Sequence, residues 1–352
     1  MRQEVSVTSR TRIPTELRVA DVDIAASARL FGRLRLGIGA YLSQGLVIRS
    51  HEEAVSIGAG SAVLENCTVI GRPGMGVGIG RRTVFGHRCT IIGATVGDLC
   101  DIGNGSTMLP GCVLGDRVFL GEGTLVPADA RLPDASVWVG RPARKLRDAT
   151  DADVDRLRRL RNGDLSIPDE PTLTYHPEER DAVGTLYAYK DATPQIGQGT
   201  VLFDSAEITG DVRIGRDCII GAGVKIIGDS HGPVRIGDRV QILENTVLHL
   251  LPDNQLLIGD DCVIGPAAMI HGCVIGDGCV IEPGAIVSDW STLGHGCRVT
   301  AGAVLVQRSE FPDRSLISGC LAERTGATRP PLDRPAWALT HDEVATITRV
   351  RR

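Results

Sequence analysis

Aromatic side chains are scarce in this sequence of 352 residues, which contains 5 Phe, 4 Tyr and 3 Trp. Because aromatic residues normally supply much of the buried area of a protein core, their scarcity excludes a conventional core built on aromatic anchors. Hydrophobic residues nevertheless make up 42% of the chain, against 23% charged residues. This balance is typical of a globular protein and excludes wholesale disorder, so small aliphatic side chains must fill the interior.

Long apolar runs and blocks of basic residues are also missing. No 18 apolar residues occur in a row, and the first residues, MRQEVSVTSRTR, have no apolar stretch behind their charges. We therefore expect a cytoplasmic protein with no membrane partner. The net charge is -5 and there is no long Lys/Arg block, so the charge distribution does not favour binding to nucleic acid. We expect the partner to be a small-molecule substrate.

What the sequence does have is a period of six. In the C-terminal half, aliphatic residues recur with one five-residue step at Ile258, Ile264, Ile270, Ile275, Ile281, Val287, Leu293, Val299 and Leu305. A helix has a period of 3.6 and a simple sheet a period of 2, so neither explains this spacing. The pattern resembles the hexapeptide repeat of left-handed parallel β-helices, in which three six-residue steps form one triangular coil. It predicts an all-β solenoid with a narrow aliphatic interior.

The same period runs through the N-terminal half, and adding 179 to its core positions from 57 to 126 gives the C-terminal series. The sequence therefore predicts two tandem β-helices, at residues 1–145 and 196–320. Residues 146–195 form a linker and 321–352 a tail, and neither follows the repeat. Thr150 with Asp153, and Thr340 with Glu343, are typical of helix starts, so we expect a short helix in each of these two segments.

Nine of the ten cysteines occupy one position of the repeat, two residues before a core aliphatic. They are Cys67, Cys89, Cys100, Cys112, Cys218, Cys262, Cys273, Cys279 and Cys297, and Cys320 falls outside the pattern. Scattered cysteines without CxxC pairs, in a chain expected to stay in the cytoplasm, are typical of reduced core residues. We expect neither disulfides nor zinc–cysteine sites.

The segment 246–287, TVLHLLPDNQLLIGDDCVIGPAAMIHGCVIGDGCVIEPGAIV, resembles the γ-class carbonic anhydrase family. In that family three histidines bind zinc, the first and third from one subunit and the second from its neighbour. The resemblance implies that His249 and His271 are the first and third ligands, whereas Pro266 replaces the second.

The N-terminal copy shows the opposite loss. Here Ile70 and Ile92 replace the first and third ligands, and His87 occupies the second position. The resemblance therefore predicts one composite metal site, with two ligands from the C-terminal half and one from the N-terminal half. Zinc is the metal we expect, although iron and cobalt also suit imidazole ligands.

The spacing of the C-terminal pair supports this interpretation. His271 follows His249 by 22 positions, which equals one coil of eighteen plus four, and the PDNQ segment can absorb the excess. The two side chains should therefore stack on one edge about 4.8 Å apart, which lets both reach one ion at about 2.1 Å. Three nitrogen ligands with an open fourth position are typical of catalytic zinc.

Several departures from the family concern catalysis. The family's Gln, six residues before the first ligand, is replaced by Leu243 and by Leu64 in the other copy, whereas the acidic residue beside it remains as Glu244 and Glu65. In the N-terminal copy, IRSHEE (48–53) resembles the family's Arg-Ser-Asp-Glu step. The resemblance implies Arg49 and Glu244 as catalytic residues that orient an anionic substrate and move a proton; an interface ion pair is the alternative. The predicted function is that of a hydratase, lyase or hydrolase acting on a small carbonyl compound or CO2.

Two other functions fit the sequence. The hexapeptide repeat is shared with acyltransferases that use acyl-CoA and a histidine base, for which His51, His231 and His295 are candidates. A non-catalytic scaffold with a vestigial site is the third possibility. In each case the N-terminal half should pack against the C-terminal half, within one chain or in a homo-oligomer, since two unlike halves cannot alternate around a ring of three.

Overall fold

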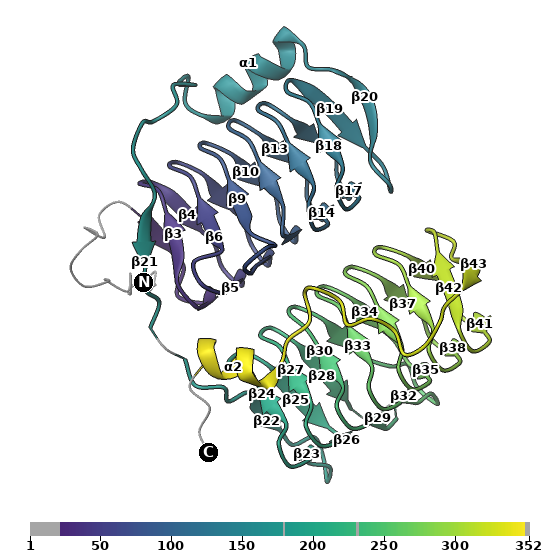
Figure 1. Cartoon of the computed structure of the whole chain (residues 1–352). Coiled ribbons are helices and arrows are strands. Elements are labelled where there is room, and N and C mark those ends of the chain that lie inside the picture. Colours follow the sequence, from purple (N-terminus) through teal and green to yellow (C-terminus); the bar gives the residue numbers. More distant parts are fainter. Residues whose placement is uncertain (1–21, 179, 230–231, 349–352) are drawn as a thin grey trace, which may run out of the picture.

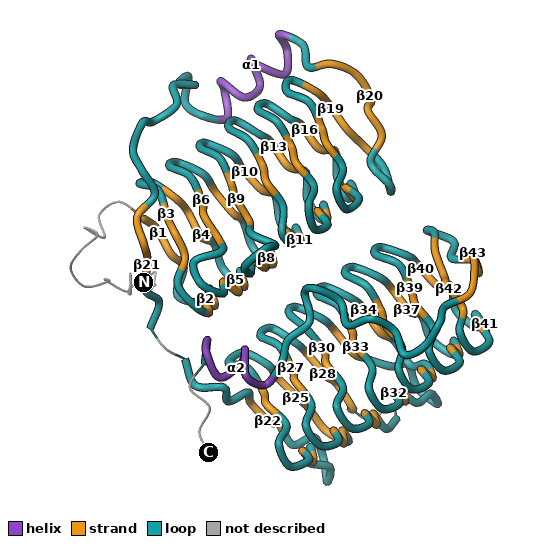
Figure 2. Tube along the Cα trace, viewed as in Figure 1, coloured by secondary structure: helices purple, strands orange, loops and turns teal. Residues whose placement is uncertain are grey.

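Two parallel β-solenoids lie side by side in the computed structural model, which describes residues 22–178, 180–229 and 232–348 (Figure 1). From β1 to β19 and from β22 to β42, strands three apart in the sequence pair in parallel, so that three sheets form the sides of a prism in each solenoid. This confirms the predicted all-β, left-handed hexapeptide-repeat fold. Short strands alternate with turns along both solenoids (Figure 2).

The N-terminal solenoid has three sheets, here named NA, NB and NC. Sheet NA contains β1 (Val22–Ile24), β4 (Ala40–Leu42), β7 (Ala62–Val63), β10 (Val84–Phe85), β13 (Asp101–Ile102), β16 (Phe119–Leu120), β19 (Ser136–Val139) and β20 (Arg144–Asp148). Sheet NB contains β2 (Arg29–Phe31), β5 (Val47–Ser50), β8 (Thr68–Gly71), β11 (Thr90–Ile92), β14 (Thr107–Met108) and β17 (Leu125–Val126). Sheet NC contains β3 (Leu34–Leu36), β6 (Val55–Ile57), β9 (Val77–Ile79), β12 (Thr95–Val96), β15 (Val113–Leu114), β18 (Arg131–Leu132) and β21 (Leu173–Tyr175).

The corresponding sheets of the C-terminal solenoid are named CA, CB and CC. Sheet CA contains β24 (Val201–Leu202), β27 (Ile219–Ile220), β30 (Gln241–Ile242), β33 (Val263–Ile264), β36 (Val280–Ile281), β39 (Arg298–Val299), β42 (Ser315–Ser318) and β43 (Glu323–Ala327). Sheet CB contains β22 (Thr185–Tyr187), β25 (Glu207–Gly210), β28 (Lys225–Gly228), β31 (Val247–Leu248), β34 (Met269–Ile270), β37 (Ile286–Val287) and β40 (Val304–Leu305). Sheet CC contains β23 (Gln195–Ile196), β26 (Val212–Ile214), β29 (Val234–Ile236), β32 (Leu256–Ile258), β35 (Val274–Ile275), β38 (Thr292–Leu293) and β41 (Glu310–Phe311).

The aliphatic residue of each hexad points into the prism and stacks on its counterpart in the next coil. Ile242 pairs with Ile264, and Leu248 with Ile270, in register, and all four are fully buried. The glycine that often follows the aliphatic residue has a steric cause: a Cβ on Gly265 would lie 2.7 Å from the backbone nitrogen of Pro283 in the next coil. The six-residue period thus fixes both the core and the close approach of successive turns.

The ends of the solenoids extend beyond the repeat. Strands β20 and β43 each fold back antiparallel on the last strand of their sheet, and they end at Asp148 and Ala327. The C-terminal solenoid begins with β22 at Thr185. The linker also contributes β21, which pairs antiparallel with β3 of the N-terminal solenoid. The linker is therefore partly built into the first solenoid.

Both predicted helices are present. In α1 (Asp151–Leu160) the backbone N–H of Thr150 donates to the Asp153 carboxylate at 2.7 Å, and Leu157 is buried on the outside of the N-terminal solenoid. The helix α2 (His341–Ile347) begins with the same pairing of Thr340 and Glu343. The sequence HDEVATITRVRR (341–352) predicts that this helix continues, but residues 349–352 lie outside the described residues. Neither helix in the described part of the chain is long and apolar enough to span a membrane.

Helix α2 lies at the junction of the solenoids (Figure 1). There, sheet NB faces sheet CA across an apolar cluster, in which the rings of Phe31 and Phe203 meet edge to face with centroids 5.1 Å apart. The buried members of this cluster are Phe31, Val47, Ile70, Met75, Ile92, Phe203, Ile219, Ala222, Leu243, Val263, Val280, Trp337, Ala338, Leu339, Val344 and Ile347. The two halves are thus in contact within one chain.

The nine repeat cysteines are buried, reduced and free of disulfide bonds, as predicted, and Cys320 is exposed. Burial raises the pKa of the Cys100 and Cys112 thiols to about 12. Since the thiolate is the reactive form, these residues should be inert in the folded protein.

We expect an aromatic disulfide reagent at pH 8 to titrate one thiol in the native protein and ten after denaturation. The reactive thiol should disappear in Cys320→Ser, whereas Cys112→Ser should leave the native count at one. Rapid reaction of several thiols in the native protein would contradict an inward orientation of the repeat cysteines.

Candidate metal centre

His249 and His271 stand at the ends of two neighbouring strands of sheet CB. His249 follows β31 and His271 follows β34, and these strands pair in register. The backbone N–H of His249 donates to the carbonyl of Ile270 at 3.0 Å, so the ladder continues up to the histidines. Their ring centroids are 5.9 Å apart at an interplanar angle of 81°. The two imidazoles therefore lie one rung apart, as their spacing in the sequence predicts, and they meet edge to face.

A buried carboxylate supports the second of these rings. Asp289 lies one coil beyond His271 and is 3% exposed. One oxygen, Oδ2, lies 3.2 Å from Nδ1 of His271. Its other oxygen, Oδ1, accepts hydrogen bonds from the backbone N–H of Leu251 and from Nδ2 of Asn254. Asp289 thus connects His271 to the loop that follows His249.

The first ring has a carboxylate nearby as well. Nε2 of His249 lies 3.7 Å from Oδ2 of Asp229, which is an ion-pair distance if the ring is protonated. The side chains of His249 and His271 are 29% and 30% exposed, so both can be reached from solvent. Two stacked, accessible imidazoles with acidic neighbours form a suitable half of a metal site.

His87 is placed elsewhere. It follows β10 of sheet NA, its side chain is 52% exposed, and its Nδ1 lies 2.6 Å from Oε2 of Glu65. The hydrogen bond from Ser43 is the main reason why the pKa of Glu65 is lowered, and His87 contributes in the same direction. Within residues 22–178, 180–229 and 232–348, no three metal-binding side chains lie together. One chain therefore brings together two of the three predicted ligands.

The counterpart of the histidine pair lies in the contact between the solenoids. Ile70 and Ile92, at the positions of His249 and His271 in the N-terminal copy, are fully buried in the apolar cluster between sheets NB and CA. Leu243, which replaces the family's Gln, belongs to the same cluster. In the contact within the chain these positions are thus filled by apolar packing.

Arg49 and Glu244 also lie in this contact. Nε of Arg49 donates to Oε1 of Glu244 at 2.7 Å, and the side chains are 1% and 2% exposed. Nη2 of Arg49 donates to the carbonyl of Trp337 at 2.7 Å. Of the two roles predicted from the sequence, the structure shows the interface ion pair. Buried to this extent, neither side chain touches solvent in this conformation.

The candidate bases for acyl transfer differ in their surroundings. His51 is 7% exposed, and burial, followed by the charge of Arg49, lowers its pKa to about 4. His295 is exposed, and its Nδ1 accepts a hydrogen bond from the backbone N–H of Asp277. Asp313 accepts in the same way from the backbone of His295, so His295 takes one place in a ladder of turn-capping side chains. His231 lies outside the described residues.

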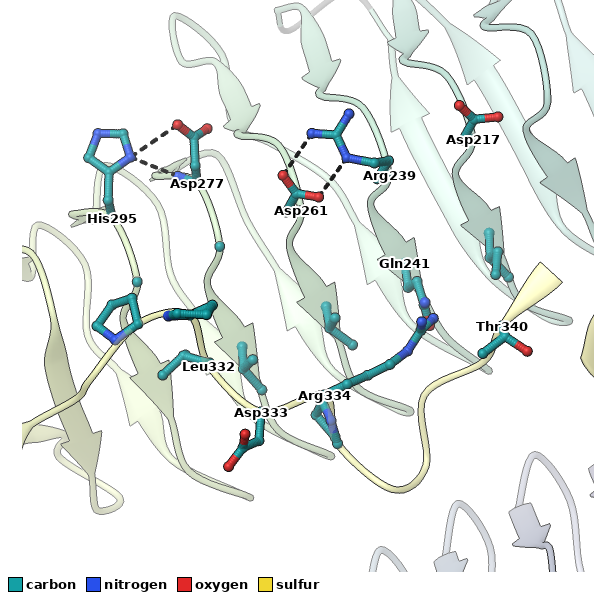
Figure 3. A pocket seen from close by; sticks show the side chains of 18 of the residues that line it. Asp217, Arg239, Gln241, Asp261, Asp277, His295, Leu332, Asp333, Arg334 and Thr340 are labelled. Atoms are coloured by element: carbon teal, nitrogen blue, oxygen red, sulfur yellow. Dashed lines mark hydrogen bonds and ion pairs between the residues drawn. The ribbon is translucent and has the colours of Figure 1, made fainter. Parts of the chain in front are cut away.

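A groove of about 970 Å³ runs beside this ladder (Figure 3). Its floor is the outer face of sheet CA, and its other wall is the tail segment 328–340, here called the strap. The strap is fixed at one end by Thr328, which donates to the carbonyl of Gly296, and at the other by Leu339, which exchanges two hydrogen bonds with the buried amide of Gln241. Arg334 extends from the strap into the groove (Figure 3).

Sequence reasoning missed Asp289, Asn254 and the strap. Asp289 lies eighteen residues after His271, which is one coil of the repeat, so the period itself could have identified it as a neighbour of the ring. For the strap the sequence contains no comparable signal, because its contacts with Gln241 join residues 98 positions apart.

Comparisons with known proteins agree with the repeat. The family model of bacterial transferase hexapeptides (six repeats) matches residues 193–228 and 257–289, and that of the hexapeptide repeat of succinyl-transferases matches 76–110 and 211–248. A carbonic anhydrase of Geobacillus kaustophilus is 32% identical over 170 residues, which cover 47% of this chain and 85% of that protein.

Two further relatives match parts of the chain. The mitochondrial gamma carbonic anhydrase 2 of Arabidopsis thaliana is 32% identical over 140 residues, 38% of this chain, and the match spans about half of that protein's length (50%). A solved structure of a Bacillus cereus protein described as an acetyltransferase is 31% identical, covers 42% of this chain and 85% of that one, and gives a TM-score of 0.41.

Removal of one partner from the buried ion pair should destabilise the protein. We expect Glu244→Ala to lower the free energy of unfolding by roughly 3–5 kcal/mol, because it leaves Arg49 charged and buried without its carboxylate. The double variant Arg49→Met/Glu244→Leu should recover most of this loss. Urea unfolding measures the free energy of unfolding of both variants. An unchanged urea midpoint in Glu244→Ala would contradict the burial of the ion pair.

The low pKa of His51 predicts an acid-sensitive junction. The unfolded chain binds a proton on this residue near its ordinary pKa of 6.5, whereas the folded protein does so near 4, so stability is lost as the pH falls through this window. Between pH 7 and pH 5 the loss should be about 2 kcal/mol. His51→Gln should flatten the pH dependence of the unfolding midpoint, and the exposed His341→Gln should not. If the midpoint changes equally with pH in the wild type and in both variants, the low pKa of His51 is refuted.

Proposed function

Because the chain belongs to the hexapeptide-repeat superfamily that includes the γ carbonic anhydrases and bacterial transferases, we propose that it is a metal-dependent hydratase, lyase or hydrolase. Its substrate would be CO2 or another small carbonyl compound. The observation that carries the proposal is the adjacent pair His249 and His271, with ring centroids 5.9 Å apart and a buried carboxylate behind one ring.

The donor set of the C-terminal solenoid fits a metal ion. Imidazole suits zinc, iron and cobalt, and a carboxylate that accepts from the second ring nitrogen is the usual outer partner of a histidine ligand. Asp289 meets that description for His271. We propose zinc as the metal, which would supply Lewis acidity that lowers the pKa of water to about 7.

The third ligand would be His87 of a second chain. Sheet CB, which carries the histidine pair, is the counterpart of sheet NB, and sheet NA, which carries His87, is the counterpart of sheet CA. Sheets NB and CA meet within the chain, whereas no described residue of a CB or NA strand belongs to that apolar cluster. A contact between CB of one copy and NA of another would bring the three imidazoles together.

The chain's own residues would hold and orient the reactants. His87 is half exposed and is held at Nδ1 by Glu65, so its Nε2 can approach a partner. Asp289 fixes the orientation of His271. In this proposal Arg49 and Glu244 join the halves by their buried ion pair.

Acyl transfer is the second candidate function, and the groove beside the strap favours it. Its apolar floor suits an acyl chain, and Arg314 and Arg334 could bind phosphate groups. The groove is also lined by five carboxylates, which would repel such an anion: Asp217, Asp261, Asp277, Asp313 and Asp333. No candidate base stands out there, however, because Nδ1 of His295 already accepts from the backbone of Asp277.

Elemental analysis of the purified protein tests the metal proposal. We expect close to one transition-metal ion per chain in the wild type and a loss of most of it in His87→Ala, His249→Ala and His271→Ala, because each removes one of three ligands. His295→Asp is the matched control, since it removes a histidine but retains a turn-capping acceptor. Hydration of CO2 and hydrolysis of small esters should fall with metal content.

Mixing variants tests the contribution of the second chain. Combined, His87→Ala and the double variant His249→Ala/His271→Ala should bind metal that neither binds alone, because one copy supplies the pair and the other the single ligand. A metal-free wild type, or full occupancy in all three single variants, would overturn the proposal. Coenzyme A binding to metal-free protein, weakened in Arg334→Ala, would support acyl transfer instead.

A further inference from the structure

We infer that Asp289 and Asn254 are positioning residues of the histidine site, which together fix the ring of His271 with Nε2 available as a ligand. The inference rests on the proposed metal function, but its physical content can be measured without metal. Asp289 is buried, and the hydrogen bonds of its carboxylate connect the rung of His271 with the loop after His249.

The hydrogen bonds of Asp289 determine which ring nitrogen carries the proton. An ionised carboxylate can only accept hydrogen bonds, so the 3.2 Å contact between Oδ2 and Nδ1 of His271 requires a proton on Nδ1. In the neutral ring the lone pair is then on Nε2. Asp289 thus selects the tautomer that presents Nε2 to an ion and limits rotation of the ring.

Asn254 connects this arrangement to the inserted loop. Its Nδ2 donates to the carbonyl of Gly272 at 2.7 Å and to Oδ1 of Asp289 at 3.2 Å. The side chain lies so close to the backbone of the next rung that a Cβ on Gly272 would come within 2.3 Å of Nδ2. The PDNQ segment, which absorbs the four extra residues between the histidines, is therefore bound to the rungs of His271 and Asp289.

The N-terminal copy provides an internal comparison. Subtraction of 179 places Pro110 at the position of Asp289 and Met75 at that of Asn254. Pro110 has no carboxylate to offer, and Met75 is buried in the apolar cluster between the solenoids. The copy with Ile70 and Ile92 in place of the histidines thus also lacks both positioning residues. The hydrogen bonds of Asp289 and Asn254 thus occur only in the copy that contains His249 and His271.

The geometry predicts the effect of one substitution in detail. In Asp289→Asn, the amide oxygen must take the place of Oδ1, because Leu251 and Asn254 both donate to that position. The amide nitrogen then occupies the place of Oδ2 and donates to Nδ1 of His271. The ring is driven to the other tautomer, with its proton on Nε2, and the ligand lone pair is no longer available.

Two measurements test this. Long-range ¹H–¹⁵N correlation spectra of metal-free protein at pH 8 should show His271 protonated on Nδ1 in the wild type and on Nε2 in Asp289→Asn. Competition with a chromophoric chelator for Zn²⁺ should show about 10–100-fold weaker binding in Asp289→Asn and a smaller loss in Asn254→Ala. The thermal midpoint of metal-free Asp289→Asn should stay close to that of the wild type.

Asp313→Asn is the matched control, since Asp313 is likewise a turn acceptor but bonds a backbone N–H and no ring; it should leave tautomer and affinity unchanged. An unchanged His271 tautomer in Asp289→Asn, or unchanged Zn²⁺ affinity in a wild type that binds the ion, would overturn the inference. A wild type that binds no Zn²⁺ but whose tautomer switches as described would refute the metal function and support the positioning role.

Discussion

The backbone ladder between successive coils is the constraint on which the rest of this structure depends. Each coil must place one aliphatic side chain inside a prism and bring its backbone within hydrogen-bonding distance of the coils on either side. Residues eighteen positions apart therefore lie directly above one another along the solenoid axis, unless a loop contains an insertion. This register places His249 beside His271 and Asp289 beside both the ring and the loop. A site built on such a ladder requires little adjustment by its side chains.

The duplicated halves have used the same faces for different purposes. At the contact within the chain, apolar residues and the ion pair between Arg49 and Glu244 replace side chains that would bind solutes. On sheet CB the corresponding positions remain polar, accessible and supported by carboxylates. A buried junction gains from apolar contact and from the absence of unpaired polar groups. A metal site requires the opposite, so one face could not serve both purposes well.

Much of the architecture could be predicted from the sequence because the period of six is a local signal. It identified the two solenoids, the inward cysteines and the stacking of His249 on His271, and the capping pairs identified both helices. The strand β21 and the strap could not be predicted in this way, since their partners lie far away in the sequence. The position of His87 relative to His249 and His271 depends on how whole solenoids pack against one another. The six-residue repeat is a local pattern and does not predict that packing.

The strap has a consequence for the order in which the molecule matures. Trp337 supplies the carbonyl that binds Arg49, and Leu339 bonds Gln241, so the strap, which follows both solenoids in the sequence, closes the junction between them. During synthesis the first solenoid emerges long before these residues exist, and domains generally fold as units from the N-terminus. Until residue 339 has been synthesised, the guanidinium of Arg49 therefore lacks one of its eventual acceptors, and the strap can lock the two prisms together only after both solenoids have been made.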